Sequence, residues 1–203
     1  MDIPDNGDLD NGVAQRVAQI FGDFVGYACD VGANDGVFNS NTLCLEKLGW
    51  TVLCVEPNPL LEADLRDFRK LVRMAACSSE DSDGSRFHIV DGHPSWASSS
   101  SLCRGETEYL QLNADTNELK PCNMFSVCVR RLDRILEEAG FPRLDYLTVD
   151  VEGWEKEVMA GFTVERWKPK VIVLEELGDA VLIPGYTMIE RRAYDNIYER
   201  DGL

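Results

Sequence analysis

The sequence predicts an α/β protein whose sheet is doubly wound, Rossmann-like and mostly parallel, and closes with an antiparallel strand pair. Short apolar runs alternate with segments of helical periodicity along most of the chain. A glycine turn joins the first run to the helix after it, as at the ligand-binding edge of open α/β sheets. Near the C-terminus, two segments alternate between apolar and polar residues with the period of strands. The order βαβαβ, then βαβ and a strand pair, favours helices on both faces of one sheet.

Each predicted element has its own sequence signal. Residues 13–24 place apolar side chains at a helical spacing, and Gly49 would end a helix predicted at 38–48. Residues 78–85 are polar and predict a turn. Further helices are predicted at 60–71, 132–139 and 154–161. Strands are predicted at 27–31, 51–55, 72–77, 86–90, 124–129, 146–151, 171–175, 186–190 and 194–200.

Charge and cysteine content exclude several classes of partner. The chain has 36 acidic and 20 basic residues, a net charge of −16, which disfavours nucleic acid and anionic membranes as partners. The seven cysteines include no C-x-x-C pair, so a zinc site has little support and buried, reduced thiols are expected. The first twelve residues lack the apolar core of a signal peptide, and no apolar run approaches the roughly 20 residues that span a bilayer. We therefore expect a cytoplasmic protein.

The turn after the first predicted strand is the most informative motif. It reads Asp30-Val31-Gly32-Ala33-Asn34-Asp35-Gly36, with the spacing G-x-x-x-G rather than the G-x-G-x-x-G of dinucleotide turns. Two carboxylates on or beside the turn would repel a phosphate, so they suit a ligand with positive charge and hydroxyl groups. S-adenosylmethionine carries an ammonium, a sulfonium and a ribose and meets that requirement. The predicted cofactor ligands here are Asp30, Gly32, Ala33, Asn34, Asp35 and Gly36.

An acidic residue follows the second strand at the expected distance. Glu56 lies 20 residues past Gly36, where a carboxylate can accept both ribose hydroxyls. Pro57 then stops the strand. The alternative is that Glu56 only caps the helix after it. Because the carboxyl ends of parallel strands share one edge, Pro57 and the end of the third strand, Ala76 and Cys77, are added to the predicted cofactor site.

A second acidic cluster ends two later strands. Asp150 lies at the end of the predicted strand 146–151, Glu152 directly follows that strand, and Glu175 ends the next one, so these carboxylates should meet Asp35 and Glu56 at one edge. If the strand stays extended, Asp150 and Glu152 lie on one side of it. The alternative is that these acids cap the helices that follow. Asp150 is also a predicted cofactor contact.

These motifs together resemble the FkbM family of S-adenosylmethionine-dependent methyltransferases. The matching pieces are the Asp30–Gly36 turn, Val55-Glu56-Pro57, Arg131-Leu132-Asp133, the 145–153 segment with Glu155, the Glu175 strand and Gly185-Tyr186. The resemblance runs from about Tyr27 to the C-terminus and implies a methyltransferase sheet and O-methylation of hydroxyls, often on sugars or other small molecules. Thr148 stands where the family often has Lys or Ser, so no role of a lysine is carried over.

Methyl transfer to a hydroxyl needs a group that takes its proton. Asp150 is the first candidate for this base or for orienting the acceptor, with Glu152 and Glu175 next and His93 and His88 behind them. The same three carboxylates could instead hold a magnesium, calcium or manganese ion, which is possible but not favoured. The acidic turn at 80–84 lacks the ligand series of a calcium loop.

Domain organisation and two other function classes complete the expectations. Residues 1–12 are predicted to be a flexible acidic N-terminus and 13–203 a single domain. Residues 91–123 are long for a loop and predict a lid or acceptor-recognition insertion, or else a passive excursion. A protein that binds S-adenosylmethionine or a partner without catalysis is the alternative function. An NAD-dependent oxidoreductase is opposed by Asp35 beside the turn.

Overall fold

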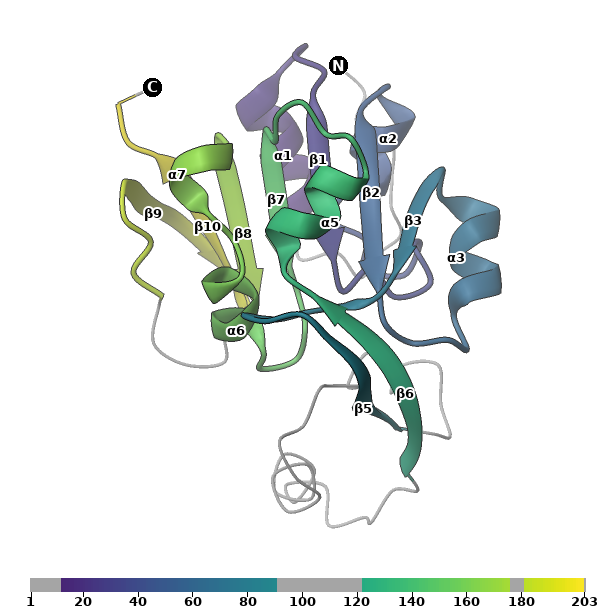
Figure 1. Ribbon diagram of the computed structural model, residues 1–203. Coiled ribbons are helices and arrows are strands. Elements are labelled where there is room, and N and C mark those ends of the chain that lie inside the picture. Colours follow the sequence, from purple (N-terminus) through teal and green to yellow (C-terminus); the bar gives the residue numbers. More distant parts are fainter. Residues whose placement is uncertain (1–11, 91–121, 176–180, 203) are drawn as a thin grey trace.

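The computed structural model describes residues 12–90, 122–175 and 181–202 (Figure 1). The predicted N-terminal segment and most of the 91–123 insertion lie outside these residues, as does His93. The division into a flexible N-terminus, one domain and an insertion therefore stays a prediction. None of the described helices is long and apolar enough to cross a membrane.

The larger sheet has seven strands, five of them parallel. They are β1 (Tyr27–Val31), β2 (Thr51–Glu56), β3 (Leu71–Met74), β7 (Tyr146–Val149), β8 (Val171–Glu175), β9 (Tyr186–Arg192) and β10 (Asp195–Arg200). Their order is β3-β2-β1-β7-β8-β10-β9, and only β10 and β9 pair antiparallel with their neighbours. The predicted mostly parallel sheet with an antiparallel C-terminal pair is confirmed. The direction of strand succession reverses between β1 and β7, which is where open α/β sheets bind ligands.

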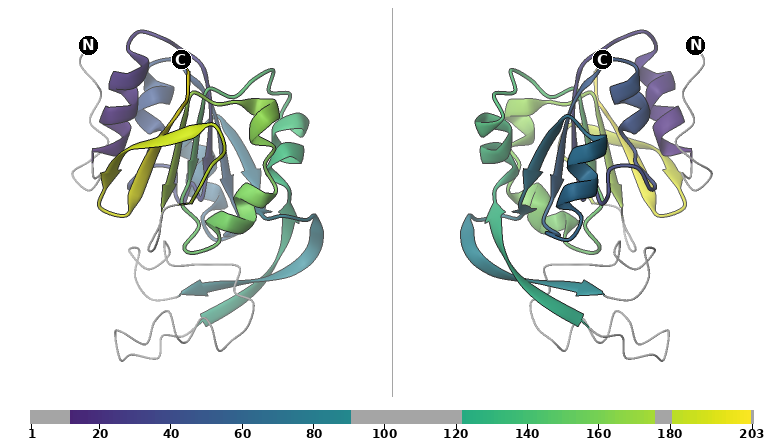
Figure 2. Two further views of the ribbon diagram at one scale, coloured as in Figure 1. Left: turned by 90° about the vertical axis from the view of Figure 1, so that its left-hand side faces the viewer. Right: turned by 90° about the vertical axis from the view of Figure 1, so that its right-hand side faces the viewer.

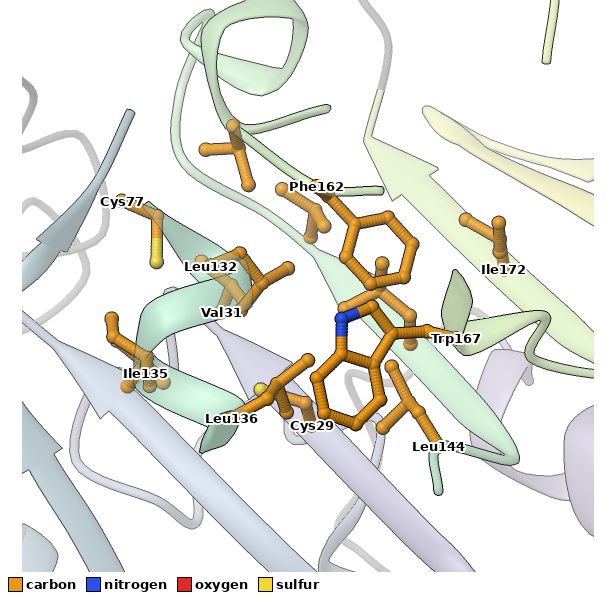
Figure 3. Close-up of a cluster of buried hydrophobic side chains, with 14 of the residues drawn as sticks. Cys29, Val31, Cys77, Leu132, Ile135, Leu136, Leu144, Phe162, Trp167 and Ile172 are labelled. Atoms are coloured by element: carbon orange, nitrogen blue, oxygen red, sulfur yellow. The ribbon is translucent and has the colours of Figure 1, made fainter. Parts of the chain in front are cut away.

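Helices cover both faces of this sheet (Figure 2). The helices are α1 (Val13–Phe21), α2 (Leu43–Lys47) and α3 (Glu62–Phe68) on one face, and α5 (Leu132–Glu138), α6 (Glu155–Ala160) and α7 (Val164–Trp167) on the other. Successive strand residues point to opposite faces, so Ala28 packs under α1 and Cys29 under α5. In the core between the sheet and α5, α6 and α7, the rings of Phe162 and Trp167 pack with Leu136 of α5 (Figure 3). The Trp167 indole donates a 2.9 Å hydrogen bond to Asp133 Oδ1, which satisfies its buried N–H.

The helix predicted at 38–48 is wrong in its first turn, since α2 begins only at Leu43. Side chains compete with the helical hydrogen bonds there. Asp35 Oδ1 accepts from the amides of Val37 and Phe38 at 2.8 Å, and Ser40 Oγ accepts from those of Thr42 and Leu43 at 3.3 and 3.1 Å. Residues 36–42 are consequently an irregular segment, which runs beside the end of β1.

The third strand, predicted at 72–77, is wrong as a single unit. β3 ends at Met74, and the amide of the next residue, Ala75, donates to the Glu56 carbonyl at 3.1 Å. β4 (Ala76–Cys77) then joins a separate sheet of order β4-β6-β5, with β5 (Ser82–Val90) antiparallel to β6 (Cys122–Arg130). β5 starts at Ser82, within the segment 78–85 that was predicted to be a turn, and its pairing with β6 is irregular between Ser82 and Ser85. The β5–β6 ribbon extends away from the larger sheet (Figure 1).

Candidate functional site

A cavity that is open to solvent lies at the carboxyl ends of β1, β2 and β7. This is the edge at which the strand order reverses, and it is where open α/β sheets bind ligands. β4 and Phe87 of β5 form a further wall. The lining residues are Asp30–Asn34, Phe38–Asn41, Val55–Pro57, Ala75–Cys77, Phe87, Asp150–Glu152 and Trp154.

Gly32 lets the turn after β1 approach the end of β7 closely. Its φ is +89°, in the region that favours glycine, and a Cβ built on it would lie 1.7 Å from the Asp150 carbonyl oxygen. The Gly32 amide donates to the Val55 carbonyl at 2.9 Å, and the Asp150 amide donates to the Val31 carbonyl at 2.9 Å. The turn is therefore fixed by backbone contacts to both neighbouring strands.

Glu56 connects the end of β2 to the same turn. Its Oε2 accepts from the Asn34 amide at 3.0 Å and its Oε1 from the Asn58 amide at 2.8 Å. Burial raises the pKa of Glu56 to about 7, although the two amide bonds lower it. Each carboxylate oxygen can accept a second hydrogen bond, so the group can still receive hydroxyl donors from a ligand.

Asp30 lies deeper, at the end of β1, and is tied to protein groups. It accepts a hydrogen bond from the Thr42 hydroxyl, and its Oδ2 lies 3.9 Å from Nη1 of the buried Arg69. Burial raises the pKa of the Asp30 carboxyl, while the Arg69 charge and the Thr42 hydroxyl lower it. Its charge is thus partly balanced before any ligand arrives.

Three carboxylates meet beyond the ends of β7 and β8. Asp150, Glu152 and Glu175 each place an oxygen within 4.8 Å of the others. Burial and the neighbouring Glu175 raise the pKa of Asp150 well above its ordinary range, and the same causes raise the pKa of Glu152 to about 8. Like charges this close favour a shared proton at neutral pH, or a bound divalent cation, for which oxygen ligands are suited.

The chain at Glu152 is not extended, contrary to the strand predicted to Val151. β7 ends at Val149, and Glu152 and Gly153 have φ of +56° and +91°. The turn brings Glu152 to the cavity by a left-handed conformation rather than by strand alternation. Glu155 stabilises this turn, because its Oε1 accepts from the amides of Val151 and Gly153 at 3.3 and 3.0 Å.

The polarity of the lining defines what the cavity can bind. Among its lining residues in the described part of the chain, four are acidic and none is Lys, Arg or His. A phosphate would meet no counter-charge from these lining residues, whereas ammonium and hydroxyl groups would find hydrogen-bond acceptors and a sulfonium would be attracted by the carboxylates. Phe38, Phe87 and Trp154 add apolar surface for the rest of a ligand.

The family model described as "Methyltransferase FkbM domain" matches residues 30–186, which contain every residue of this cavity. The chain belongs to the FkbM methyltransferase family. The FkbM chain is also 31% identical over 158 residues to the 2-O-methyltransferase NoeI of Sinorhizobium fredii (strain NBRC 101917 / NGR234). The match covers 72% of this chain and 61% of that relative's length. No solved structure matches the chain.

The FkbM cavity brings most of the predicted site residues together. Asp35, Gly36 and Glu175 are the predicted residues that do not line it. Asp35 caps the backbone at 37–38, and Gly36 packs against Arg69, whose Cγ would lie 2.6 Å from an added Cβ. Glu175 contacts the site through Asp150. The predicted residues that do line the cavity are Asp30, Gly32, Ala33, Asn34, Glu56, Pro57, Ala76, Cys77, Asp150 and Glu152.

Several side chains that line the FkbM cavity could not be predicted as site residues from the sequence. Asn39 and Asn41 line the cavity from the segment that was predicted to be helical. Phe87 lines the cavity from the separate three-stranded sheet. Trp154 lines it as well, and its indole N–H donates a 3.2 Å hydrogen bond to Ser78 Oγ. No periodicity marks these residues as site residues, because their placement depends on tertiary contacts.

Proposed function

We propose that this FkbM protein is an S-adenosylmethionine-dependent methyltransferase that methylates a hydroxyl oxygen of a small molecule or sugar. The observation that carries the proposal is the acidic lining at the switch point between β1 and β7, with no basic side chain among the lining residues that the structure describes. The strand order supports a Rossmann-like methyltransferase fold, since both halves of the parallel sheet start at β1 and β7 and run outward.

The residues present fit the proposed cofactor. Glu56 would accept the ribose hydroxyls at the end of β2, and Asp30, Gly32 and Asn34 would form the wall beside the turn. The cofactor supplies a methyl group on a positively charged sulfur, which reacts by in-line displacement. The cluster of Asp150 and Glu152 would favour that positive charge, and it would ionise more readily when the charge is nearby.

The chain's own part in catalysis is positioning and proton transfer. An acceptor hydroxyl held near Asp150 would lose its proton to that carboxylate, with Glu152 and Glu175 as the next candidates, as its oxygen bonds to the methyl carbon. The bond from the methyl carbon to the cofactor sulfur would break in the same step and leave S-adenosylhomocysteine. Burial and the neighbouring carboxylates raise the pKa of Asp150, so we expect Asp150 to act as a base when the positive charge of the sulfonium lies nearby and lowers that pKa.

We expect the acceptor to be neutral or cationic, because the protein carries a net charge of −16 and its cavity is acidic. Neither nucleic acid nor an anionic membrane surface is an expected partner for the same reason. Four of the described cysteines, Cys29, Cys44, Cys54 and Cys77, are buried free thiols, and this supports a cytoplasmic location. NoeI is named a 2-O-methyltransferase, which supports oxygen as the methylated atom.

The test is methyl transfer from radiolabelled S-adenosylmethionine to a panel of hydroxylated small molecules and carbohydrates. Asp150→Asn keeps the shape and removes the charge, so kcat should fall by about 10²- to 10⁴-fold with cofactor affinity changed much less. Glu165→Gln, exposed on α7 and outside the cavity, is the matched control and should retain full activity. Cofactor binding without transfer to any acceptor would instead favour a catalytically silent binding protein.

A further inference from the structure

A buried arginine outside the lining of this cavity is hydrogen-bonded to one of the cavity's walls. Arg69, at the end of α3, has a side chain with no exposed surface. Its Nε donates to Glu46 Oε2 of α2 at 2.6 Å, which neutralises the charge by a buried ion pair. The remaining donors of its guanidinium point toward the irregular segment 36–42.

Those donors fasten the segment at three points. Arg69 Nη1 donates to the Gly36 carbonyl at 3.0 Å and to Ser40 Oγ at 3.1 Å, and Nη2 donates to Thr42 Oγ1 at 2.7 Å. Thr42 in turn donates to Asp30. A planar guanidinium can make this set of bonds in one fixed geometry, which a lysine cannot.

The fastened segment and Asp30 both form the cavity wall. Phe38–Asn41 line the cavity between two of the fastened residues, Gly36 and Thr42. Segment 36–42 has few regular backbone hydrogen bonds of its own, so side-chain contacts must fix its course. A glycine is needed at position 36 because Arg69 packs closely against it. A Cβ there would lie 2.6 Å from Arg69 Cγ and 2.8 Å from Leu65 Cδ1.

We propose that Arg69 is a positioning residue for the cofactor site, acting through Thr42 and Ser40 to hold Asp30 and residues 38–41 in the shape that binds S-adenosylmethionine. The proposal rests on the proposed function for the identity of the ligand. The ordering of segment 36–42 by Arg69 can be tested without any ligand.

Replacing Arg69 by an apolar residue would leave two buried carboxylates without a counter-charge and unfold the protein. The test therefore uses Thr42→Val, which removes one donor and one acceptor from the network and keeps the charges. Thr42→Ser retains the hydroxyl and serves as the rescue variant. Thr163→Val is the matched control, because the Thr163 hydroxyl also donates a hydrogen bond to a carboxylate, that of Asp133. This pair lies on the opposite face of the sheet.

Two measurements are made on the full chain: hydrogen–deuterium exchange of the 36–42 amides, and S-adenosylhomocysteine affinity by calorimetry. In Thr42→Val we expect faster exchange and about 3- to 10-fold weaker binding, the effect of one or two lost hydrogen bonds. Arg69→Lys should change both quantities in the same direction. Thr42→Ser and Thr163→Val should remain close to the wild type in both.

The proposal is overturned if Thr42→Val leaves exchange and affinity unchanged, or if Thr163→Val changes both as much. Faster exchange with unchanged affinity would show that the network orders the segment without positioning the cofactor site, and would also refute it. If wild-type protein binds no S-adenosylhomocysteine, the proposed function fails, and the exchange data alone decide whether Arg69 orders residues 36–42.

Discussion

Replacing Glu56 by glutamine should change how the stability of the protein depends on pH. The Glu56 carboxyl is 6% exposed, and its burial raises the pKa from 4.5 to about 7. Between these two values the folded protein holds a proton that the unfolded chain has released. The stability that Glu56 contributes is therefore full below pH 4.5, decreases as pH rises, and is lost above pH 7.

The size of the effect follows from the two pKa values. A pKa that moves from 4.5 to about 7 corresponds to about 3 kcal/mol of unfolding free energy, an order-of-magnitude figure. Glutamine does not titrate, so this decrease should disappear from the variant. Glutamine also offers only one acceptor oxygen to the Asn34 and Asn58 amides, but that cost is the same at every pH.

The assay is urea unfolding of the wild type and Glu56→Gln at pH 5, 7 and 9. The loss of unfolding free energy between pH 5 and 9 should be about 2–3 kcal/mol smaller in Glu56→Gln than in the wild type. Other carboxyls titrate in both proteins and cancel in the comparison. Glu62→Gln, whose side chain is 45% exposed on α3, is the control and should behave as the wild type. Parallel pH profiles for Glu56→Gln and the wild type would refute the raised pKa of Glu56.

Four further outcomes are expected. Glu56→Ala should weaken S-adenosylmethionine binding by about 1–3 kcal/mol in calorimetry, and unchanged affinity in a folded variant would remove Glu56 from the site. Gly32→Ala should lower the free energy of unfolding by about 4 kcal/mol or more in urea unfolding. Gly140→Ala is the control: Gly140 is also at positive φ, but a Cβ there would have no atom within 4 Å, so the loss should be only about 1–2 kcal/mol. Equal losses would contradict the close approach of Gly32 to β7. Affinity for S-adenosylmethionine relative to S-adenosylhomocysteine should rise by about tenfold from pH 6 to pH 9, because Glu152, whose pKa is raised to about 8, ionises and attracts the sulfonium; a constant ratio would place the sulfonium elsewhere. Activity should survive EDTA, and a complete loss that magnesium or manganese restores would favour a metal at the three carboxylates.

Sequence periodicity predicted the parallel strands well because burial dictates their composition. β1, β2 and β8 are apolar runs covered on both faces, and their observed bounds lie within one residue of the predicted ones. The carboxyl ends of such strands share an edge in any parallel sheet, so Gly32, Glu56 and Asp150 could be grouped before the structure was known.

The parts that were missed depend on contacts between distant segments. The break at Ala75 arises because β4 pairs with β6, about 50 residues later, and no local signal carries that pairing. The late start of α2 arises from side chains that bond to nearby amides in place of a helical turn. Gly32 and Gly36 are glycines of the same turn and cannot be told apart from the sequence. Gly36, with a φ of +82°, packs against Arg69, whereas Gly32 lies close to the end of β7.

The attachment of the β5–β6 ribbon has a consequence for how specificity changes among related proteins. β4 joins β6 through only the pairs Ala76–Val129 and Cys77–Arg130, and Phe87 reaches the cavity from the ribbon. Substitutions in β5 and β6 can thus alter one wall of the pocket while the core of the larger sheet stays intact. The β1 turn has no such freedom, since Gly32 admits no larger side chain. Among related proteins, differences in this pocket should therefore accumulate on the ribbon, and the turn after β1 should change slowly.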